Sequence, residues 1–410
     1  MSEWKEVRLG DVILHSCSGG TPKSNVSEYY DGEIPWLNTK EIDFNRIYQT
    51  ERNITQKGLD NSSAKWIDEK CVIIAMYGAT AGKIAINMIP LTTNQACCNL
   101  KVDDRLADFR YIYYFLKKDF KFLASLANGG AQQNLNSQII KDYVIKLPSL
   151  SIQKEISDLL WTIDAKIETN NKLNEKLEEM AQAIFKSWFV DFEPFKDKPF
   201  HETELGMIPE AWEVKRISEN DFYISDFVSN GSFASLKQNV TLLDYPDYAY
   251  FIRNTDLKVG KFKVYVNKES YDFLSKSKLT GGEIIISNVG DVGSVFLCPK
   301  LEKPMTLGNN IIMIKPSNEI FKYYLFQYFS SPIGQYMIDG ISGGSVQRKF
   351  NKTDFRAMKI LIPSKNILMN YYNIIKPVFD FKEELGKEND RLASLRDTLL
   401  PRLMSGELIV

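Results

Sequence analysis

Two loops of the chain place amide and basic side chains directly after a pair of glycines. One runs from Gly129 to Asn136 and the other from Gly343 to Asn351. A Gln or Asn amide can pair with the edge of an adenine base, and cationic side chains can hold phosphate groups. The glycines would allow the backbone to come close to such a ligand. The candidate DNA-binding side chains in these loops are Gln132, Gln133, Asn134, Gln347, Arg348 and Lys349. The alternative is that both loops only turn the chain and cap a following helix; the duplication of the pattern favours DNA.

A second set of polar side chains follows apolar, strand-like segments at matching places in the two halves of the chain. Its members are Asn38, Thr39 and Lys40, and Arg253, Asn254 and Thr255. They could present polar tips to a DNA groove, where phosphate contacts are commoner than base contacts. Turn chemistry at the end of a strand is the alternative for each of them. For the polar residues at the glycine turns we favour a purely structural role; these are Tyr77, Thr80, Lys83, Asn288 and Asp291.

Motifs for catalysis are missing from the sequence. His15 and His201 stand outside any metal-ligand spacing, and the five cysteines form no C-x-x-C pair. The segment from Gly78 to Lys83 resembles a phosphate-binding loop, but it has three residues between its glycines where four are needed. There is no Asn-Pro-Pro-aromatic segment and no glycine-rich turn suited to S-adenosylmethionine. The sequence therefore predicts a chain with no catalytic residues, no metal site and no cofactor of its own.

The polar loops belong to an internal repeat of about half the chain. Gly129 and Gly343 stand 214 residues apart, and Pro148 and Pro363 stand 215 apart. Earlier landmarks follow in the same order: Trp4 to Leu9 is echoed by Trp212 to Ile217, Ile34 to Ile42 by Tyr250 to Leu257, and Ile73 to Gly82 by Ile285 to Gly293. Landmarks in one order at nearly one spacing predict two homologous domains in tandem.

Each half combines strand and helix signals. Short runs rich in Ile, Val, Tyr and Phe alternate with Gly, Asn and Asp turns, whereas residues 109–126 and 321–337 have helical spacing. The combination of strand and helix signals predicts a domain with both kinds of element, so the fold class expected for the whole chain is α+β.

A long helix is predicted after each half. From Ile152 to roughly Phe192 the chain has no proline or glycine, which corresponds to about 60 Å of helix. Its apolar residues keep a heptad, and so do those near the C-terminus, which predicts that the two helices pair as a coiled coil. The first row is Ile156, Ile163, Asn170, Leu177 and Ile184, with Tyr371, Val378, Leu385, Leu392 and Leu399. The second row is Leu159, Leu173 and Met180, with Ile374, Phe381 and Leu395.

Two residues interrupt this pattern. Pro377 should kink or restart the second helix, so its regular part is expected to begin near Val378. Asn170 occupies a position in the first row. It either fixes the register of the pair or marks a solvated kink, and the sequence does not decide between these interpretations.

Composition narrows the class of protein. The formal net charge of -1 means that DNA affinity must come from local basic faces or from partner proteins. The charged N-terminus lacks a signal core, no apolar run could span a bilayer, and the cysteine pattern suits a reducing compartment. We expect a cytoplasmic protein with no membrane contact.

Three segments and the overall layout resemble the specificity subunits of type I restriction-modification systems. The segments are Ile184-Phe185-Lys186-Ser187-Trp188-Phe189-Val190-Asp191-Phe192, Leu205-Gly206-Met207-Ile208-Pro209-Glu210-Ala211-Trp212 and Leu399-Leu400-Pro401-Arg402-Leu403-Met404-Ser405-Gly406-Glu407-Leu408. The resemblance covers essentially all 410 residues. It implies a target-recognition domain at 1–150, a central spacer helix at 151–194, a linker at 195–208, a second target-recognition domain at 209–364 and a C-terminal spacer helix at 365–410.

The same resemblance implies function and partners. Each domain would read one half of a split, asymmetric target in double-stranded DNA, and the antiparallel helices would set the distance between the halves. Two modification subunits would bind S-adenosylmethionine and methylate adenine, and optional restriction subunits would use ATP and Mg. The alternatives are a coiled-coil adaptor that binds proteins only, or a detached recognition part of a fused restriction-methyltransferase. Trp188, Phe189 and Phe192 are assigned to packing or to contact with a modification subunit.

Overall fold

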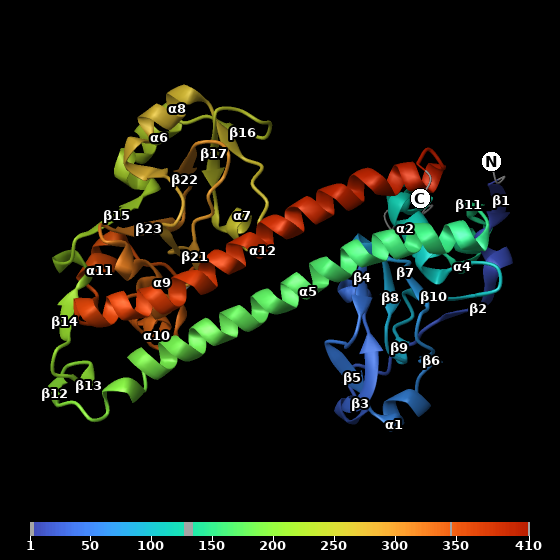
Figure 1. Ribbon diagram of the computed structural model, residues 1–410, viewed down its shortest axis with the longest axis horizontal. Helices are drawn as coiled ribbons and strands as arrows, with labels where there is room; N and C mark the ends of the chain where they lie inside the picture. The colour runs from blue at the N-terminus through green and yellow to red at the C-terminus, as the bar shows by residue number, and fades with distance from the viewer. Residues whose placement is uncertain (1–3, 127–133, 345–346, 409–410) are drawn as a thin grey trace. The chain divides into compact units, whose positions relative to one another are not determined.

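The computed structural model describes residues 4–126, 134–344 and 347–408. The chain divides into two compact units, each drawn in Figure 1. Unit 1 consists of Met1–Asn171 with Gly386–Val410, and unit 2 consists of Lys172–Leu385. Each unit contains one segment of the central helix and one segment of the C-terminal helix.

Unit 1 contains two sheets and a strand pair. The first sheet has the order β2-β10-β7-β8-β4 and the second the order β5-β3-β9-β6, while β1 pairs with β11. The strands are β1 (Lys5–Arg8), β2 (Ile13–Ser18), β3 (Tyr30–Leu37), β4 (Asn45–Ile47), β5 (Arg52–Ile54), β6 (Trp66–Ile67), β7 (Val72–Ala75), β8 (Ile84–Asn87), β9 (Leu91–Thr93), β10 (Cys97–Val102) and β11 (Val144–Leu147). The short helices are α1 (Gln56–Asp60), α2 (Phe109–Lys118), α3 (Phe120–Ser125) and α4 (Ser137–Asp142).

Unit 2 repeats this plan. Its sheets have the orders β15-β23-β20-β21 and β16-β18-β17-β22-β19, and β14 pairs with β24 as β12 does with β13. The strands are β12 (Phe200–Thr203), β13 (Gly206–Pro209), β14 (Glu213–Arg216), β15 (Phe222–Asp226), β16 (Leu242–Leu243), β17 (Ala249–Ile252), β18 (Tyr265–Val266), β19 (Lys278–Leu279), β20 (Ile284–Ser287), β21 (Val295–Leu297), β22 (Met305–Leu307), β23 (Ile311–Pro316) and β24 (Lys359–Ile362). The short helices are α6 (Phe233–Asn239), α7 (Asn254–Val259), α8 (Lys268–Phe273), α9 (Lys322–Ser330), α10 (Pro332–Gly340) and α11 (Lys352–Ala357).

The repeat extends to strand register. In unit 1, Cys98 pairs with both Ser18 and Ile74. In unit 2, Ile312 pairs with both Asp226 and Ile286. The two halves therefore share one topology, which confirms the predicted pair of homologous α+β domains.

The central strands are continuous apolar runs because both of their faces are buried in a hydrophobic core. Val72 and Ile74 of β7 belong to a core that also contains the tyrosines of α2. Ile73 and Ala75 point to the opposite face and join a separate core with Leu37 and Leu91 of the second sheet. Since side chains alternate along a strand, a strand buried on both faces must be apolar at every position.

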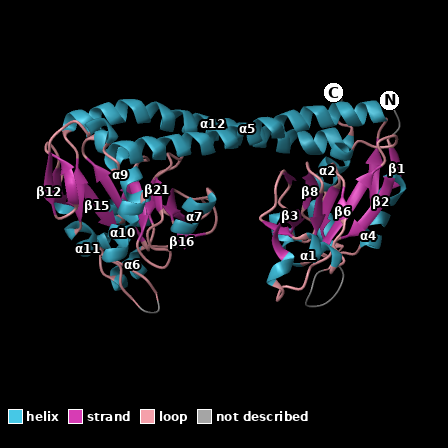
Figure 2. Cartoon of the chain, turned by 90° about the horizontal axis from the view of Figure 1, so that it is seen from below, coloured by secondary structure: helices cyan, strands magenta, loops and turns pink. Residues whose placement is uncertain are grey.

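Two long helices complete both units. They are α5 (Leu150–Phe189) and α12 (Lys365–Ser405). In each unit a segment of α5 lies beside a segment of α12 (Figure 2). The pairing is antiparallel: in unit 1 Asp164 binds Arg396 at 2.8 Å, while Asn170 contacts Asn389 at 2.9 Å. The helix pair shows the predicted coiled-coil arrangement.

The heptad prediction is half right. The first row faces the partner helix, with Ile156, Asn170, Tyr371 and Leu385 buried. The second row is wrong, because its members are 37% to 48% exposed. The buried second row lies one residue later and includes Leu160, Ala181, Leu368, Ile375 and Leu403. Both positions are apolar in the pairs Leu159–Leu160, Met180–Ala181 and Ile374–Ile375, so the sequence pattern alone could not choose between them there.

Proline does not interrupt the second helix. α12 is one continuous helix from Lys365 to Ser405, so the expected restart near Val378 is wrong. Pro377 is exposed, and a backbone carbonyl that loses its helical partner there can turn to water. Residues 195–208, expected to be a linker, form the end of a short 3₁₀ turn and the hairpin β12–β13.

Asn170 holds a polar layer in the helix pair of unit 1. It is 1% exposed, and its amide nitrogen donates to Glu388 at 2.7 Å and to Asn389 at 2.9 Å. Lys166 completes the layer at 3.3 Å from Glu388. A solvated kink does not fit this burial, so of the two interpretations the structure supports fixation of the register.

Asn170→Ala should therefore weaken the helix pair without changing the sheets. The variant loses two hydrogen bonds inside a buried layer and should lower the Tm by about 2–4 °C. Differential scanning calorimetry of the full chain measures the change. Asn171→Ala is the control, because Asn171 is exposed and accepts one bond from Asn389. Equal losses in both variants would contradict a special role for Asn170.

Candidate nucleic-acid interface

Three of the predicted polar segments meet in unit 2. They are the start of α7, the glycine turn between β20 and β21, and the loop that leads to α11. The Asn254 amide nitrogen lies 3.3 Å from a carboxylate oxygen of Asp291 in the glycine turn. The backbone nitrogen of Gly290 donates to the carbonyl of Arg348 at 3.0 Å. Residues far apart in the sequence thus form one polar edge, called here the loop edge of unit 2.

Unit 1 brings the corresponding segments together. Tyr77 forms a backbone bridge with Asn134, and the Leu135 nitrogen donates to the carbonyl of Met76 at 2.8 Å. Lys83 in the glycine turn pairs with Asp43 at 2.7 Å. Gln132 and Gln133 lie outside the described residues. In the described part of unit 1 the glycine turn therefore contacts the loop at Asn134 and the segment that follows Lys40, and these residues are called the loop edge of unit 1.

Most of the polar side chains that follow β3 take part in local turn chemistry. The carboxamide oxygen of Asn38 accepts from the Lys40 nitrogen at 3.3 Å, which caps the 3₁₀ turn Thr39–Glu41. The Thr39 hydroxyl donates to the same oxygen at 3.5 Å, and Lys40 pairs with Glu51 at 2.6 Å. These contacts favour the turn interpretation for Asn38, whereas Lys40 remains exposed.

The equivalent residues of unit 2 differ in whether their polar groups have hydrogen-bond partners. The Arg253 guanidinium donates two hydrogen bonds to Asp256, at 2.9 and 2.7 Å, and these bonds raise its pKa. Its charge is therefore balanced by a buried carboxylate. Asn254 keeps a buried carboxamide oxygen with no hydrogen-bond partner among the described residues. Thr255 is exposed.

The loop before α11 presents its side chains to solvent. Gln347, Arg348 and Lys349 are all exposed. Arg348 pairs with Asp339 at 2.5 Å on the surface, whereas Lys349 has no carboxylate partner in the described part of the chain. The backbone of Lys349 is fixed by two 2.9 Å bonds with Gly343, so its side chain projects from an ordered base.

Glycine is required in this loop and in the turn beside it. Gly344 has φ of +109°, and a Cβ there would lie 2.4 Å from the carbonyl oxygen of Gln347. Gly290 and its counterpart Gly78 have φ of +79° and +73°. Left-handed backbone favours glycine, so these positions have a structural reason for their residue type. This supports the structural role assigned to the glycine turns.

Asp291 and Lys258 form an ion pair of 2.6 Å in the loop edge of unit 2. Hydrogen bonds from Lys258 and from Ser294 lower the pKa of the Asp291 carboxyl group to about 2. Because the lysine and the carboxylate offset each other, this pair adds no net charge to the edge.

A second polar group, at the start of α11, could not be identified from the sequence. Lys352 pairs with Asp226 of β15 at 3.1 Å and also contacts Ser229. Its only sequence signal was its position directly after Asn351, which caps α11 by accepting from the Asp354 nitrogen at 2.9 Å. The partner residues come from the other end of the domain sequence, so local spacing could not reveal them.

The aromatic cluster near the end of α5 is core. Phe189 is 2% exposed, and its ring lies 4.8 Å from Tyr371 and 5.6 Å from Trp212. Trp188 is half-buried against Tyr371 and Phe195. These rings are used in packing within unit 2.

Four of the five cysteine thiols are buried, and Cys17 is partly exposed. Burial raises the pKa of Cys71 to about 12 and of Cys98 to about 11, and raises those of Cys97 and Cys298 further. Within the described ranges there is no group of three or more His, Cys, Asp or Glu residues that could hold a metal ion. None of the helices in those ranges is long and apolar enough to cross a bilayer. The chemistry available at the loop edges is hydrogen bonding and charge.

Comparison with known proteins gives one consistent result. A family model described as a type I restriction modification DNA specificity domain matches residues 1–179 and 209–392. The MjaIX specificity subunit of Methanocaldococcus jannaschii is 29% identical over 429 residues, covering 100% of this chain and 94% of that protein. The HindI specificity subunit of Haemophilus influenzae is 24% identical, and the alignment covers 100% of both chains. A crystal structure of a type I S subunit from M. genitalium has a TM-score of 0.59 at 18% identity, covering 98% of this chain and 96% of that one, which indicates a shared fold.

Proposed function

Because this chain belongs to the family of type I restriction-modification DNA specificity subunits, we propose that it recognises a two-part DNA sequence and confers that specificity on separate enzyme subunits. The observation that carries the proposal is the duplicated loop edge. Each domain gathers three polar segments at one edge of a rigid sheet scaffold, as direct readout of a DNA groove requires. The two edges carry different side chains, so the target is asymmetric.

The helix pair supports two further parts of the proposal. The helices α5 and α12 each run without a break from one unit into the other. They would therefore act as a spacer that fixes the gap between the half-sites. Leu173, Met180, Ile374 and Phe381 are partly exposed apolar side chains of the two helices, and the proposal assigns them to contact with other subunits. Two modification subunits would supply S-adenosylmethionine chemistry, and optional restriction subunits would supply ATP- and Mg-dependent cleavage.

Genome-wide mapping of methylated adenine tests the proposal. The full chain is expressed with its modification subunit in a host that lacks methylation of its own, and single-molecule sequencing reads the modified sites. The expected result is one split, asymmetric motif that vanishes when this chain is omitted. Methylation that is unchanged by omission, or a stable complex without a sequence-selective footprint, would favour a protein adaptor.

Two variants of the loop before α11 should separate phosphate contact from base contact. Lys349→Ala should weaken binding to all duplexes alike and reduce the salt slope of log K by about 0.9, because one phosphate contact is lost. Gln347→Ala should instead relax selection at one base pair of one half-site. Binding titrations at several salt concentrations measure both effects.

Lys365→Ala is the matched control for Lys349→Ala, since Lys365 is exposed at the start of α12 in the same unit. Its salt slope should equal that of the unmodified protein. An equal reduction in both lysine variants would mean that the effect reports net charge and not the loop edge.

A further inference from the structure

Unit 2 has extra chain between β15 and β17 when it is compared with unit 1. The register equivalence of Ser18 and Asp226 places these residues 208 apart. After the connection, Trp36 pairs with Thr92 as Phe251 pairs with Thr306, and the equivalent residues Trp36 and Phe251 are 215 apart. The connection in unit 2 is therefore longer by seven residues. It contains α6 and is called here the α6 segment, residues 227–248.

The α6 segment forms part of the apolar wall of a cavity of about 460 Å³. Leu236 is buried in this wall, while Phe233 and Leu242 at the cavity are 81% and 53% exposed. Asn309, Asn310 and Asn351 belong to the polar part of the lining. The cavity thus adjoins the loop that supplies Gln347 to Lys349. Figure 2 shows α6 and α11 at the end of unit 2 opposite its long helices.

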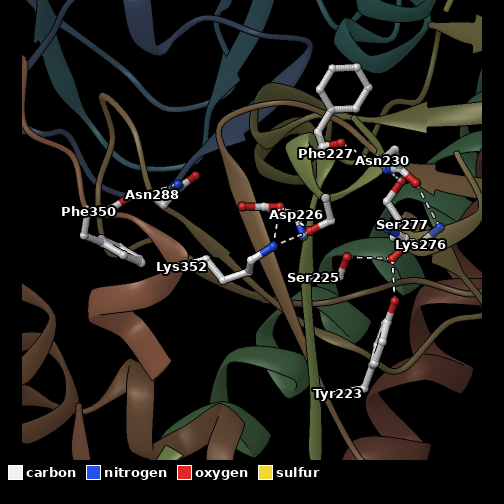
Figure 3. A network of polar contacts seen from close by, with 11 residues as sticks. Tyr223, Ser225, Asp226, Phe227, Asn230, Lys276, Ser277, Asn288, Phe350 and Lys352 are labelled. Carbon is white, nitrogen blue, oxygen red and sulfur yellow. Dashed lines mark hydrogen bonds and ion pairs between the residues drawn. The ribbon is translucent and has the colours of Figure 1, made fainter. Parts of the chain in front are cut away.

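The base of the α6 segment is held firmly. Lys352 binds Asp226 at 3.1 Å, and the Ser229 hydroxyl donates to the same carboxylate at 2.5 Å. Asn230 donates to the Ser277 hydroxyl at 2.8 Å and accepts from the Lys276 nitrogen at 2.9 Å (Figure 3). Exposed apolar side chains therefore project from an ordered base, as recognition elements with a preorganised scaffold do.

Charge and hydrogen bonding identify the ligand that fits this surface. Lys237 on α6 is exposed and, like Lys349, has no carboxylate partner within the described ranges. The side-chain amides of Asn309 and Asn310 are exposed and have no hydrogen-bond partner there either. Cations select a polyanion, and amides pair with adenine. An apolar group beside them suits the methyl group of thymine, which lies on the major-groove edge of the same base pair.

We propose that the α6 segment reads an A·T base pair through the major groove, with Phe233 against the thymine methyl group and Asn309 and Asn310 at the adenine edge. This inference rests on the proposed function and adds the residues that give unit 2 its own half-site. Unit 1 lacks the extra chain, so its half-site is read without this contact.

Removal of single methyl groups from the DNA tests the proposal. The complex of the full chain with its modification subunits is titrated with duplexes in which each thymine of the mapped target is replaced by deoxyuridine. One position in the half-site that responds to Gln347→Ala should weaken binding about fourfold, the value of one buried methyl group. Phe233→Ala should bind the thymine duplex about fourfold more weakly than the unmodified protein does. Replacement of that thymine by deoxyuridine should then weaken its binding no further. Asn310→Gly, which suits the φ of +65° at that position, should relax selection at the same base pair.

Tyr336→Ala is the control, because Tyr336 is 77% exposed on α10 and does not line the cavity. It should keep the full deoxyuridine response. The proposal is overturned if Phe233→Ala keeps that response, or if it weakens only assembly with the modification subunits, which would make the segment a protein contact. If the unmodified complex selects no sequence at all, the proposed function fails first and this inference fails with it.

Discussion

Phe189→Ala is expected to lower the free energy of unfolding of unit 2 by about 3–5 kcal/mol, the usual cost of truncating a buried aromatic ring. Phe189 is 2% exposed and lies 4.8 and 4.9 Å from the rings of Tyr371 and Tyr324. It joins α5 to both α12 and the domain core, so the cavity left behind would weaken three elements together. Hydrogen exchange resolved by peptide measures the effect, and β20 and β23 should lose protection while β7 and β10 of unit 1 keep theirs.

Leu173→Ala is the matched control for this prediction. Leu173 lies on the same helix within unit 2 but belongs to the exposed row, with 37% of its surface accessible. Its truncation should cost less than about 1 kcal/mol. Similar losses for the two variants would show that the rows of α5 have been assigned to the wrong faces.

Insertion of four residues into each long helix, after Asn171 and after Leu385, should move the two half-sites apart by about one base pair. Four helical residues add about 6 Å and a rotation of about 40°. One base-pair step rotates DNA by about 36° and advances it by about 3.4 Å, so the added length matches one to two steps and the added rotation matches one. Both half-site sequences should stay the same, because neither loop edge is altered. Sequencing of methylated adenine gives the new gap directly.

The control is the same insertion between Glu204 and Leu205, at the exposed turn of the hairpin β12–β13. It should leave the gap unchanged. A changed half-site in the helix variant, or an unchanged gap, would contradict the assignment of α5 and α12 as the spacer.

The repeat and the long helices could be predicted from the sequence because each rests on a regular pattern. Landmarks such as the two Gly-Gly loops keep their order and spacing, and the helix without glycine or proline predicted from Ile152 is present from Leu150 onward. The buried first row followed from its heptad. Even the α6 segment left a signal, since Trp4 and Trp212 stand 208 residues apart and the Gly-Gly loops 214 apart.

Tertiary structure decided what each polar or apolar side chain does. Leu159 and Leu160 are both apolar, yet only the packing of α5 against its neighbours buries Leu160 and leaves Leu159 exposed. Arg253 and Lys349 are both cations in predicted loops, but a buried Asp256 neutralises the first and nothing in the described chain pairs with the second. Sequence periodicity determines which faces a helix or strand offers, because it follows from backbone geometry. Which partner meets each face depends on contacts between residues far apart in the chain, and these form only in the folded domain.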